Sequence, residues 1–211
     1  MDELPWDHTG YYGSKDQLHA IGALITAWNS VEMGMHSILK EFFRIHESRL
    51  TPLFDDMSNS TRLKFLKTFA EEKETPNVCQ AVNIFCKYAN ICVGNRNLIT
   101  HATILNIDDK IYARKIASGH QQYKEYSFSL EQIRNAVDET RDVGRFGYEL
   151  SLFIKIRGRA QSLNGDTKRY SGHVENFQGK SVPAYKTLPE APAQPVSLTQ
   201  PPRKKSEHKN K

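Results

Sequence analysis

The sequence predicts a mainly α-helical protein: a bundle of four to five helices, with a small β-hairpin between the third and fourth helices and a disordered C-terminal tail. Apolar residues recur at helical spacing over long stretches before residue 100 and again after residue 129. Short segments rich in β-branched and aromatic residues lie between these stretches. The last fifty residues are rich in proline and lysine and have no periodicity, which is typical of disorder.

The first helix is expected over residues 16–45. Its apolar stripe consists of Leu18, Ile21, Ile25, Trp28, Met35, Leu39 and Phe42. The gap between Trp28 and Met35 holds Glu32 where an apolar residue is expected. A carboxylate on an apolar stripe costs free energy unless it is paired. Glu32 therefore either lies at the edge of the stripe in contact with water or pairs with a buried cation.

The second and third helices follow a Ser/Thr-rich turn. The cluster at residues 58–61 offers an N-cap, and Leu63, Leu66 and Ala70 predict a helix that ends near Lys73. Pro76 suits the first turn of the third helix. The apolar stripe of that helix consists of Val78, Val82, Phe85, Ala89 and Cys92, and the next step of four reaches Arg96. Arg96 is therefore predicted on the buried side of the helix, with Glu32 as its candidate partner.

The hairpin is expected from residues 103–106 and 110–117, joined through residues 107–109, with a third strand at 123–128. Ser129 can cap the last helix, and Gln132 follows it at capping-box spacing. This helix is predicted to reach about Ile156. Gly144 and Gly147 inside it indicate either close approach of another helix or a weak point.

The charge distribution divides the chain. Residues 155–211 hold 12 of the 29 Lys and Arg residues but only 4 of the 24 Asp and Glu residues. A basic tail attracts polyanions, although it could equally serve only solubility. We therefore expect an N-terminal extension at residues 1–14, a helical domain at 15–157 and a disordered, basic, Pro-rich tail at 158–211.

Cysteine usage and hydropathy predict a cytoplasmic protein. The three cysteines, Cys79, Cys86 and Cys92, are odd in number and lack paired zinc spacing, which favours free thiols. No signal-peptide pattern opens the chain, and no run approaches the roughly 18 apolar residues of a membrane span. No metal-ligand spacing and no glycine-rich phosphate loop occur, so we expect no metal and no cofactor.

The candidate catalytic residues lie at the expected end of the third helix, in the segment Arg96-Asn97-Leu98-Ile99-Thr100-His101. The arginine is a permanent cation and the histidine titrates near neutrality. Such a pair can carry out phosphate chemistry without a metal, although Arg96 could also cap a helix end beside an ordinary histidine. Five helical residues turn about 140°, so the pair converges only if the helix ends near Thr100 or if two subunits contribute.

Arg, then Asn, then three residues, then His at a helix end resembles the signature of the HEPN superfamily. These helical-bundle domains occur in many intracellular ribonucleases and in toxin–antitoxin and phage-defence systems. The run Trp28-Asn29-Ser30-Val31-Glu32 in the first helix is similar to the tryptophan-plus-acid pattern of one HEPN branch. The order of the expected elements is similar too, and the resemblance covers residues 15–156.

The resemblance implies a metal-independent endoribonuclease that acts on RNA as a homodimer, with both motifs in one cleft. His101 would act on the ribose 2′-hydroxyl or the leaving oxygen, and Arg96 would hold the scissile phosphate. Asn97 would orient the histidine or the RNA backbone, and Glu32 would support Arg96. A neutralising antitoxin is a further partner that such systems use. Two alternatives stay open: a non-catalytic HEPN-like dimer that binds RNA, nucleotide or a protein, and a structural helical protein in which both residues are incidental.

Overall fold

The computed structural model describes residues 14–101, 103–107, 110–116, 123–163 and 188–199. The helices in these residues are α1 (Lys15–Phe43), α2 (Glu47–Asp56), α3 (Asn59–Lys73), α4 (Pro76–His101) and α5 (Leu130–Leu163). The strands, all between α4 and α5, are β1 (Thr103–Ile107), β2 (Lys110–Ile116) and β3 (Tyr123–Phe128). The predicted helical bundle with strands before the last helix is confirmed.

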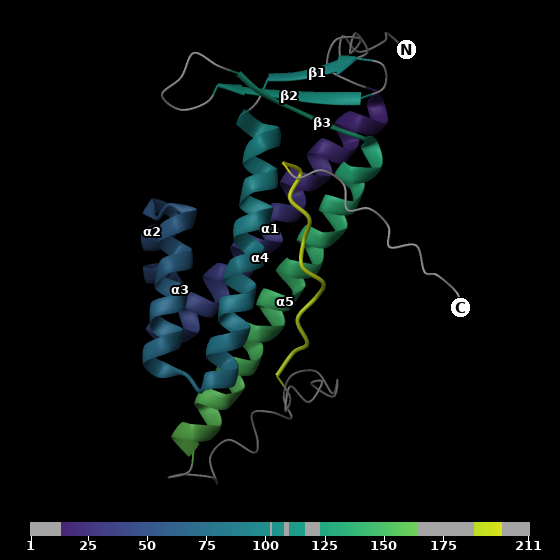
Figure 1. Cartoon of the computed structure of the whole chain (residues 1–211). Coiled ribbons are helices and arrows are strands. Elements are labelled where there is room, and N and C mark those ends of the chain that lie inside the picture. Colours follow the sequence, from purple (N-terminus) through teal and green to yellow (C-terminus); the bar gives the residue numbers. More distant parts are fainter. Residues whose placement is uncertain (1–13, 102, 108–109, 117–122, 164–187, 200–211) are drawn as a thin grey trace, which may run out of the picture.

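The long helices α1, α4 and α5 run side by side, and α2 and α3 flank them on one side (Figure 1). The three strands form an antiparallel sheet in the order β1-β2-β3, with Thr103 paired to Arg114 and Ile111 paired to Phe128. This sheet covers the end of the bundle where α4 ends and α5 begins. The third strand expected at residues 123–128 is therefore confirmed, together with the hairpin.

Local capping signals determine where helices begin. Ser14 forms a capping box with Gln17 at the start of α1, and Ser58 caps α3 by accepting from the backbone N–H of Thr61. Ser129 and Gln132 form the reciprocal pair of bonds predicted for the last helix, at 2.8 and 3.2 Å. Pro52 lies inside the short helix α2, which the sequence did not predict. A proline there has no N–H to donate to the carbonyl four residues before it, so α2 lacks this internal hydrogen bond.

The buried stripe of α1 differs from the prediction in its first half. Leu18 and Ile25 are 36% and 37% exposed, whereas Leu24, Val31 and Ile38 are fully buried. Both sets repeat every seven residues, so the period alone could not choose between them. Contact with α5 selects the second set.

Gly144 and Gly147 of α5 allow this contact. Of the two interpretations that the sequence left open for these glycines, the close approach of another helix is confirmed. A Cβ added at Gly144 would lie 2.9 Å from the carbonyl carbon of Ser30 on α1. A Cβ at Gly147 would lie 3.2 Å from Cα of Gly34 and would overlap the ring of Phe85. The absence of side chains therefore sets the separation of α1 and α5.

The core has two parts. The larger part joins all five helices around Trp28, Met35, Leu66, Phe85 and Leu150. The smaller part lies beneath the sheet and contains Leu24, Leu98, Ile99, Ile111, Phe128, Ile133 and, from the far end of the chain, Leu198. Leu198 shows that part of the C-terminal region is docked.

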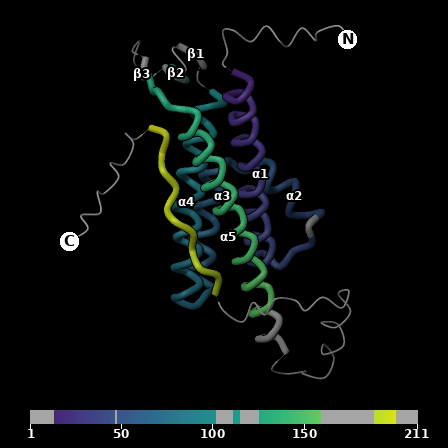
Figure 2. Tube along the Cα trace, turned by 90° about the vertical axis from the view of Figure 1, so that its right-hand side faces the viewer, coloured from purple at the N-terminus to yellow at the C-terminus, as the bar shows by residue number. Residues whose placement is uncertain are grey.

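The predicted tail boundary is therefore wrong in two places. Helix α5 continues to Leu163 instead of ending near Ile156. Residues 188–199, here called the C-terminal strap, lie extended along α4 and α5 (Figures 1 and 2). Leu188 and Ala191 pack against the larger core, and Leu198 is 7% exposed in the smaller one. The predicted disorder of residues 164–187 and 200–211, and the predicted extension at residues 1–13, lie outside the described residues.

Candidate functional site at the end of helix α4

The motif at residues 96–101 occupies the last two turns of α4, as predicted. Leu98 and Ile99 are buried in the smaller core and hold this end of the helix against the sheet. The helix continues unbroken to His101, and the hydroxyl of Thr100 donates to the carbonyl oxygen of Arg96 at 3.0 Å. The polar residues of the motif are thus carried on a rigid element.

Arg96 lies at the edge of the buried face of α4. The stripe continues from Cys92 through Asn95 to Leu98, so Asn95 takes the buried position that the sequence predicted for Arg96. The reason is that the helix needs steps of three as well as four to keep one face toward the core. Arg96 is half-buried as a consequence.

The guanidinium of Arg96 has unused hydrogen-bonding capacity. Its Nη1 donates to Oδ1 of Asn97 at 3.0 Å. Its Nε is buried and has no hydrogen-bond partner in the described part of the chain. A buried donor without an acceptor costs about 1–3 kcal/mol. An anion would recover that free energy only if the side chain of Arg96 moved so that Nε could reach it.

Asn97 and His101 are four residues apart on the helix, so they lie on one side of it, and His101 is exposed. Arg96 and His101 are separated by roughly 140° around the axis and about 7.5 Å along it. Because α4 does not end before His101, one chain presents the two side chains in different directions. Arg96 and His101 of one chain therefore do not share a face of α4.

Glu32 does not support Arg96, so this part of the predicted site is wrong. Its Oε1 accepts instead from Nη1 of Arg62 at 2.8 Å, which joins α1 to the start of α3. Arg62 is 7% exposed and also donates to the carbonyl oxygen of Phe54 from Nε and Nη2. The buried cation that pairs with Glu32 is therefore Arg62 and not Arg96, and Arg62 follows the capping residue Ser58 by one helical turn.

A second feature of α4 is the clamp that Asn95 forms on the C-terminal strap. Its Nδ2 donates to the carbonyl oxygen of Val196 at 2.9 Å, and its Oδ1 accepts from the backbone N–H of Leu198 at 2.8 Å. Asn95 is 1% exposed, so both halves of its amide are used in the interior. On α5, Oε2 of Glu139 accepts from the N–H of Val196 at 2.8 Å. The strap is therefore bound through its backbone.

The sequence contained one signal for the strap. Pro189, Pro192 and Pro195 recur every three residues, and the next step of three reaches Leu198. Three residues is the repeat of the polyproline II helix, so these four residues can share one face. Of these four, Pro195 and Leu198 are buried and Pro189 and Pro192 are half-buried. Their composition alone resembles a disordered tail.

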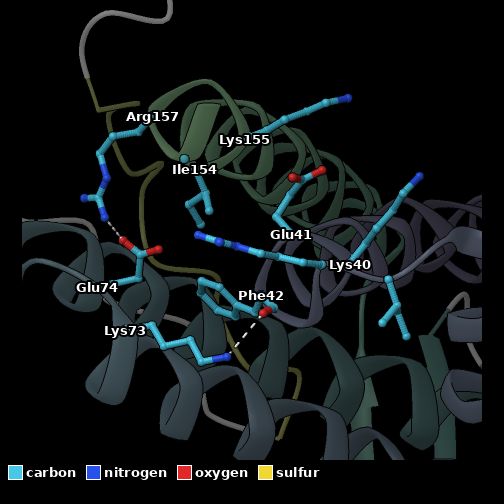
Figure 3. Close-up of a pocket in the computed structure, with 11 residues that line it drawn as sticks. Lys40, Glu41, Phe42, Lys73, Glu74, Ile154, Lys155 and Arg157 are labelled. Carbon is cyan, nitrogen blue, oxygen red and sulfur yellow. Dashed lines mark hydrogen bonds and ion pairs between the residues drawn. The ribbon is translucent and has the colours of Figure 1, made fainter. Parts of the chain in front are cut away.

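A basic pocket lies at the opposite end of the bundle from the sheet. It has a volume of about 480 Å³ and is lined by Lys40, Arg44, Lys73, Lys155 and Arg157, together with Glu41 and Glu74 (Figure 3). Arg157 pairs with Glu74 and donates to Oγ1 of Thr75 at 2.9 Å. Burial raises the pKa of the Glu74 carboxyl, although Arg157 acts in the opposite direction. The cations here also face the C-terminal ends of α1 and α3, whose partial negative charge they balance.

None of the helices in the described ranges is both long and apolar enough to cross a membrane. Comparisons with protein-family models, with curated proteins and with solved structures found no match to this chain. We therefore infer function from the chain's own residues.

Proposed function

We propose that the protein is a metal-independent endoribonuclease of HEPN type that acts as a homodimer, with Arg96 and His101 of both copies at a shared cleft. A growth-arresting toxin or phage-defence effector is the role that the resemblance implies. The observation that carries the proposal is the Arg96 guanidinium, which is half-buried and held by Asn97, and whose Nε lacks a partner among the described residues. Such a cation is suited to binding an RNA phosphate.

In the proposed reaction, the imidazole of His101 takes the proton of the ribose 2′-hydroxyl. The 2′-oxygen then bonds to phosphorus, and the bond from phosphorus to the 5′-oxygen breaks to leave a cyclic phosphate. The histidine of the second copy returns a proton to the leaving oxygen. Arg96 holds the non-bridging oxygens as their negative charge increases.

Asn97 keeps its predicted role of orienting the histidine or the RNA backbone and gains a second one. Its Oδ1 accepts from Arg96, so it can position the arginine, and its Nδ2 can donate to an RNA oxygen. Glu32 takes no part in the proposal because Arg62 binds it. The divergence of Arg96 and His101 on one helix is the reason that the proposal requires a dimer.

The test is cleavage of labelled single-stranded RNA in EDTA by the full chain. We expect His101→Ala to lower the rate by at least about 100-fold, because the proton transfer is lost. His19→Ala is the matched control, since His19 is also exposed on a helix but is far from the motif in sequence. Cleavage by the His101→Ala protein at the normal rate, or no cleavage of any RNA by the wild type, would contradict the proposal.

The same site allows a second function, a non-catalytic dimer that binds RNA, nucleotide or a protein partner. The observation that favours it is that Arg96 receives no support from the Glu32 carboxylate, because Glu32 binds Arg62 instead. An expression experiment distinguishes the nuclease from the binding protein. The wild type and His101→Ala are expressed in parallel, and both growth and RNA integrity are measured. Growth arrest and RNA loss with the wild type alone favour the nuclease.

A further inference from the structure

We propose that the basic pocket at the end of the bundle away from the sheet binds a nucleotide-sized small molecule through a diphosphate group. The pocket volume of about 480 Å³ lies within the range of small-molecule sites. Helix α4 begins at Pro76, two residues after Glu74 of the pocket, and ends at His101, so about 35–40 Å of helix separates the pocket from the Arg96–His101 motif. The inference therefore goes beyond the proposed function and does not depend on it.

Five cations from three helices line the pocket. They come from the end of α1, the end of α3 and the passing helix α5: Lys40, Arg44, Lys73, Lys155 and Arg157. Two almost fully buried side chains, Phe42 and Ile154, line the pocket as well, with 4% and 5% of their surface exposed. The pocket therefore combines an apolar floor with surrounding cations, and a floor of low polarity strengthens the electrostatic field inside the pocket.

The pocket carries more positive charge than the fold neutralises. The five cations face two carboxylates, Glu41 and Glu74, which leaves an excess of three positive charges. The C-terminal ends of α1 and α3 each contribute about half a negative charge, so together they offset about one of these charges. An anion that binds among the cations would reduce the repulsion that remains between them.

Two of the five cations have partners within the fold. Arg157 pairs with Glu74, whose side chain is 10% exposed, and Nζ of Lys73 donates to the carbonyl oxygen of Phe42 at 3.4 Å (Figure 3). Because Arg157 neutralises Glu74, this carboxylate opposes an incoming anion less than a free carboxylate would.

Arg44 and Lys155 are the cations best placed to bind a ligand. Among the described residues, neither side chain forms a hydrogen bond or an ion pair. Burial raises the pKa of the Glu74 carboxyl, and the charges of Arg157 and Arg44 act against this rise, which shows that the Arg44 guanidinium acts on the pocket. The planar fork of an arginine can hold two phosphate oxygens, and a lysine ammonium can hold a third.

The backbone of Arg44 supports a role for its side chain. Arg44 ends α1 in the left-handed conformation with φ of 52°, where a glycine would avoid the steric cost of a Cβ. The arginine therefore costs stability at this position, and an anion that binds its guanidinium gives a physical reason for that cost. Arg44→Gly should for the same reason remove the cation without unfolding the protein.

Charge and size together favour a diphosphate. A phosphate monoester carries about 1.5–2 negative charges at neutral pH, and a second linked phosphate adds about one more, which is close to the excess of three in the pocket. The rest of the volume can hold the organic part of the molecule. The cations surround a pocket and do not form a stripe along one face, so a small molecule fits this arrangement better than an RNA strand.

The test is isothermal titration calorimetry of the full chain with sodium pyrophosphate and with ADP. We expect both probes to bind, and inorganic phosphate to bind at least about tenfold more weakly because it contacts fewer cations. Arg44→Gly and Lys155→Gln should each weaken pyrophosphate binding by at least about tenfold. Lys64→Gln is the matched control. It removes the same charge from an exposed position of α3 outside the pocket, and it should change the affinity by less than about twofold.

Urea unfolding of each variant shows whether it is folded, and Arg44→Gln replaces Arg44→Gly if the glycine variant is destabilised. No binding of pyrophosphate or ADP tighter than about 1 mM would overturn the proposal. A folded Arg44 or Lys155 variant that binds pyrophosphate with the wild-type affinity would overturn it too. If these variants lose affinity for single-stranded RNA while the wild type does not bind pyrophosphate, the cations bind nucleic acid and the small-molecule site is refuted.

Failure of this inference differs from failure of the proposed function. His101→Ala should bind pyrophosphate with the wild-type affinity, because the motif lies at the other end of α4. If the pocket variants lose pyrophosphate binding while the wild type cleaves no RNA, the pocket proposal stands and the nuclease is overturned. If the wild type cleaves RNA but does not bind pyrophosphate or ADP, the nuclease stands and the pocket proposal is overturned.

Discussion

Arg62 donates from Nη1 to Oε1 of Glu32 at 2.8 Å, and this ion pair joins the first turn of α3 to the middle of α1. The same guanidinium donates to Oδ1 of Asn59 and to the carbonyl oxygen of Phe54, and it lies 3.7 Å from the centroid of the Phe54 ring. All three of its nitrogens are therefore used within the fold. The pair has a structural role, and it leaves Arg96 available for a ligand.

Arg62→Met is expected to lower the free energy of unfolding by about 3 kcal/mol, because the buried carbonyl of Phe54 and the carboxylate of Glu32 both lose their donor. Urea unfolding followed by circular dichroism measures this. Arg134→Met is the control, since Arg134 pairs with Asp16 while both side chains are more than half exposed, and it should change stability by less than about 0.5 kcal/mol. Equal effects of the two changes would contradict the structural role of Arg62.

Arg96→Met is expected to behave differently from Arg62→Met. Methionine keeps much of the side-chain volume and removes the buried Nε that has no partner in the described residues. The free energy of unfolding should stay constant or rise by about 1 kcal/mol. A loss of 2 kcal/mol or more in the same urea experiment would indicate that Arg96 serves the fold and not a ligand.

Gly147→Ala is expected to destabilise the protein by about 3 kcal/mol, because the new methyl group would overlap Phe85 and press on Gly34. Gly22→Ala is the matched change in an exposed part of α1, where no heavy atom lies within 4 Å of the added Cβ. It should stabilise the protein by about 0.5–1 kcal/mol through helix propensity. Thermal unfolding would show opposite shifts, and a neutral Gly147→Ala would contradict the close packing of α1 on α5.

Arg44→Gly is expected to stabilise the protein by about 1 kcal/mol. Arg44 terminates α1 in the left-handed conformation with φ of 52°, where glycine avoids the steric cost of a Cβ. Lys64→Gly, at an exposed position inside α3, should instead destabilise by about 1 kcal/mol. Chemical denaturation of both variants measures the contrast, and a destabilised Arg44→Gly protein would show that the arginine side chain stabilises this end of the bundle.

The three thiols are expected to differ in reactivity. Burial raises the pKa of Cys86 to about 12 and that of Cys92 to about 11, so both remain protonated and shielded at pH 8. Cys79 is only partly buried. Iodoacetamide should therefore label one thiol per folded chain, at Cys79, and three after unfolding in guanidinium. Rapid labelling of Cys86 or Cys92 in the folded protein, detected by peptide mass spectrometry, would contradict this packing.

Local patterns accounted for most of the bundle. Ser58 and Ser129 act as helix caps, the apolar periods of α3 and α4 mark their buried faces, and the β-branched segments form strands. Each of these depends on residues close together in the chain. Local patterns did not identify the buried face of α1. The stripes that contain Leu18 and Leu24 have the same period, and only the packing of α5 determines which of them is buried.

The sequence by itself determined that Arg96, Asn97 and His101 lie at the end of a helix that precedes strands. Tertiary structure decided the rest of the site. Glu32 and Arg62 are 30 residues apart, and Asn95 is 101 residues from Val196. Such pairs form because a buried polar group takes whichever partner the packed helices bring within hydrogen-bonding distance. For that reason the partner of Glu32, the place of Asn95 in the core and the docking of residues 188–199 could be read only from the folded chain.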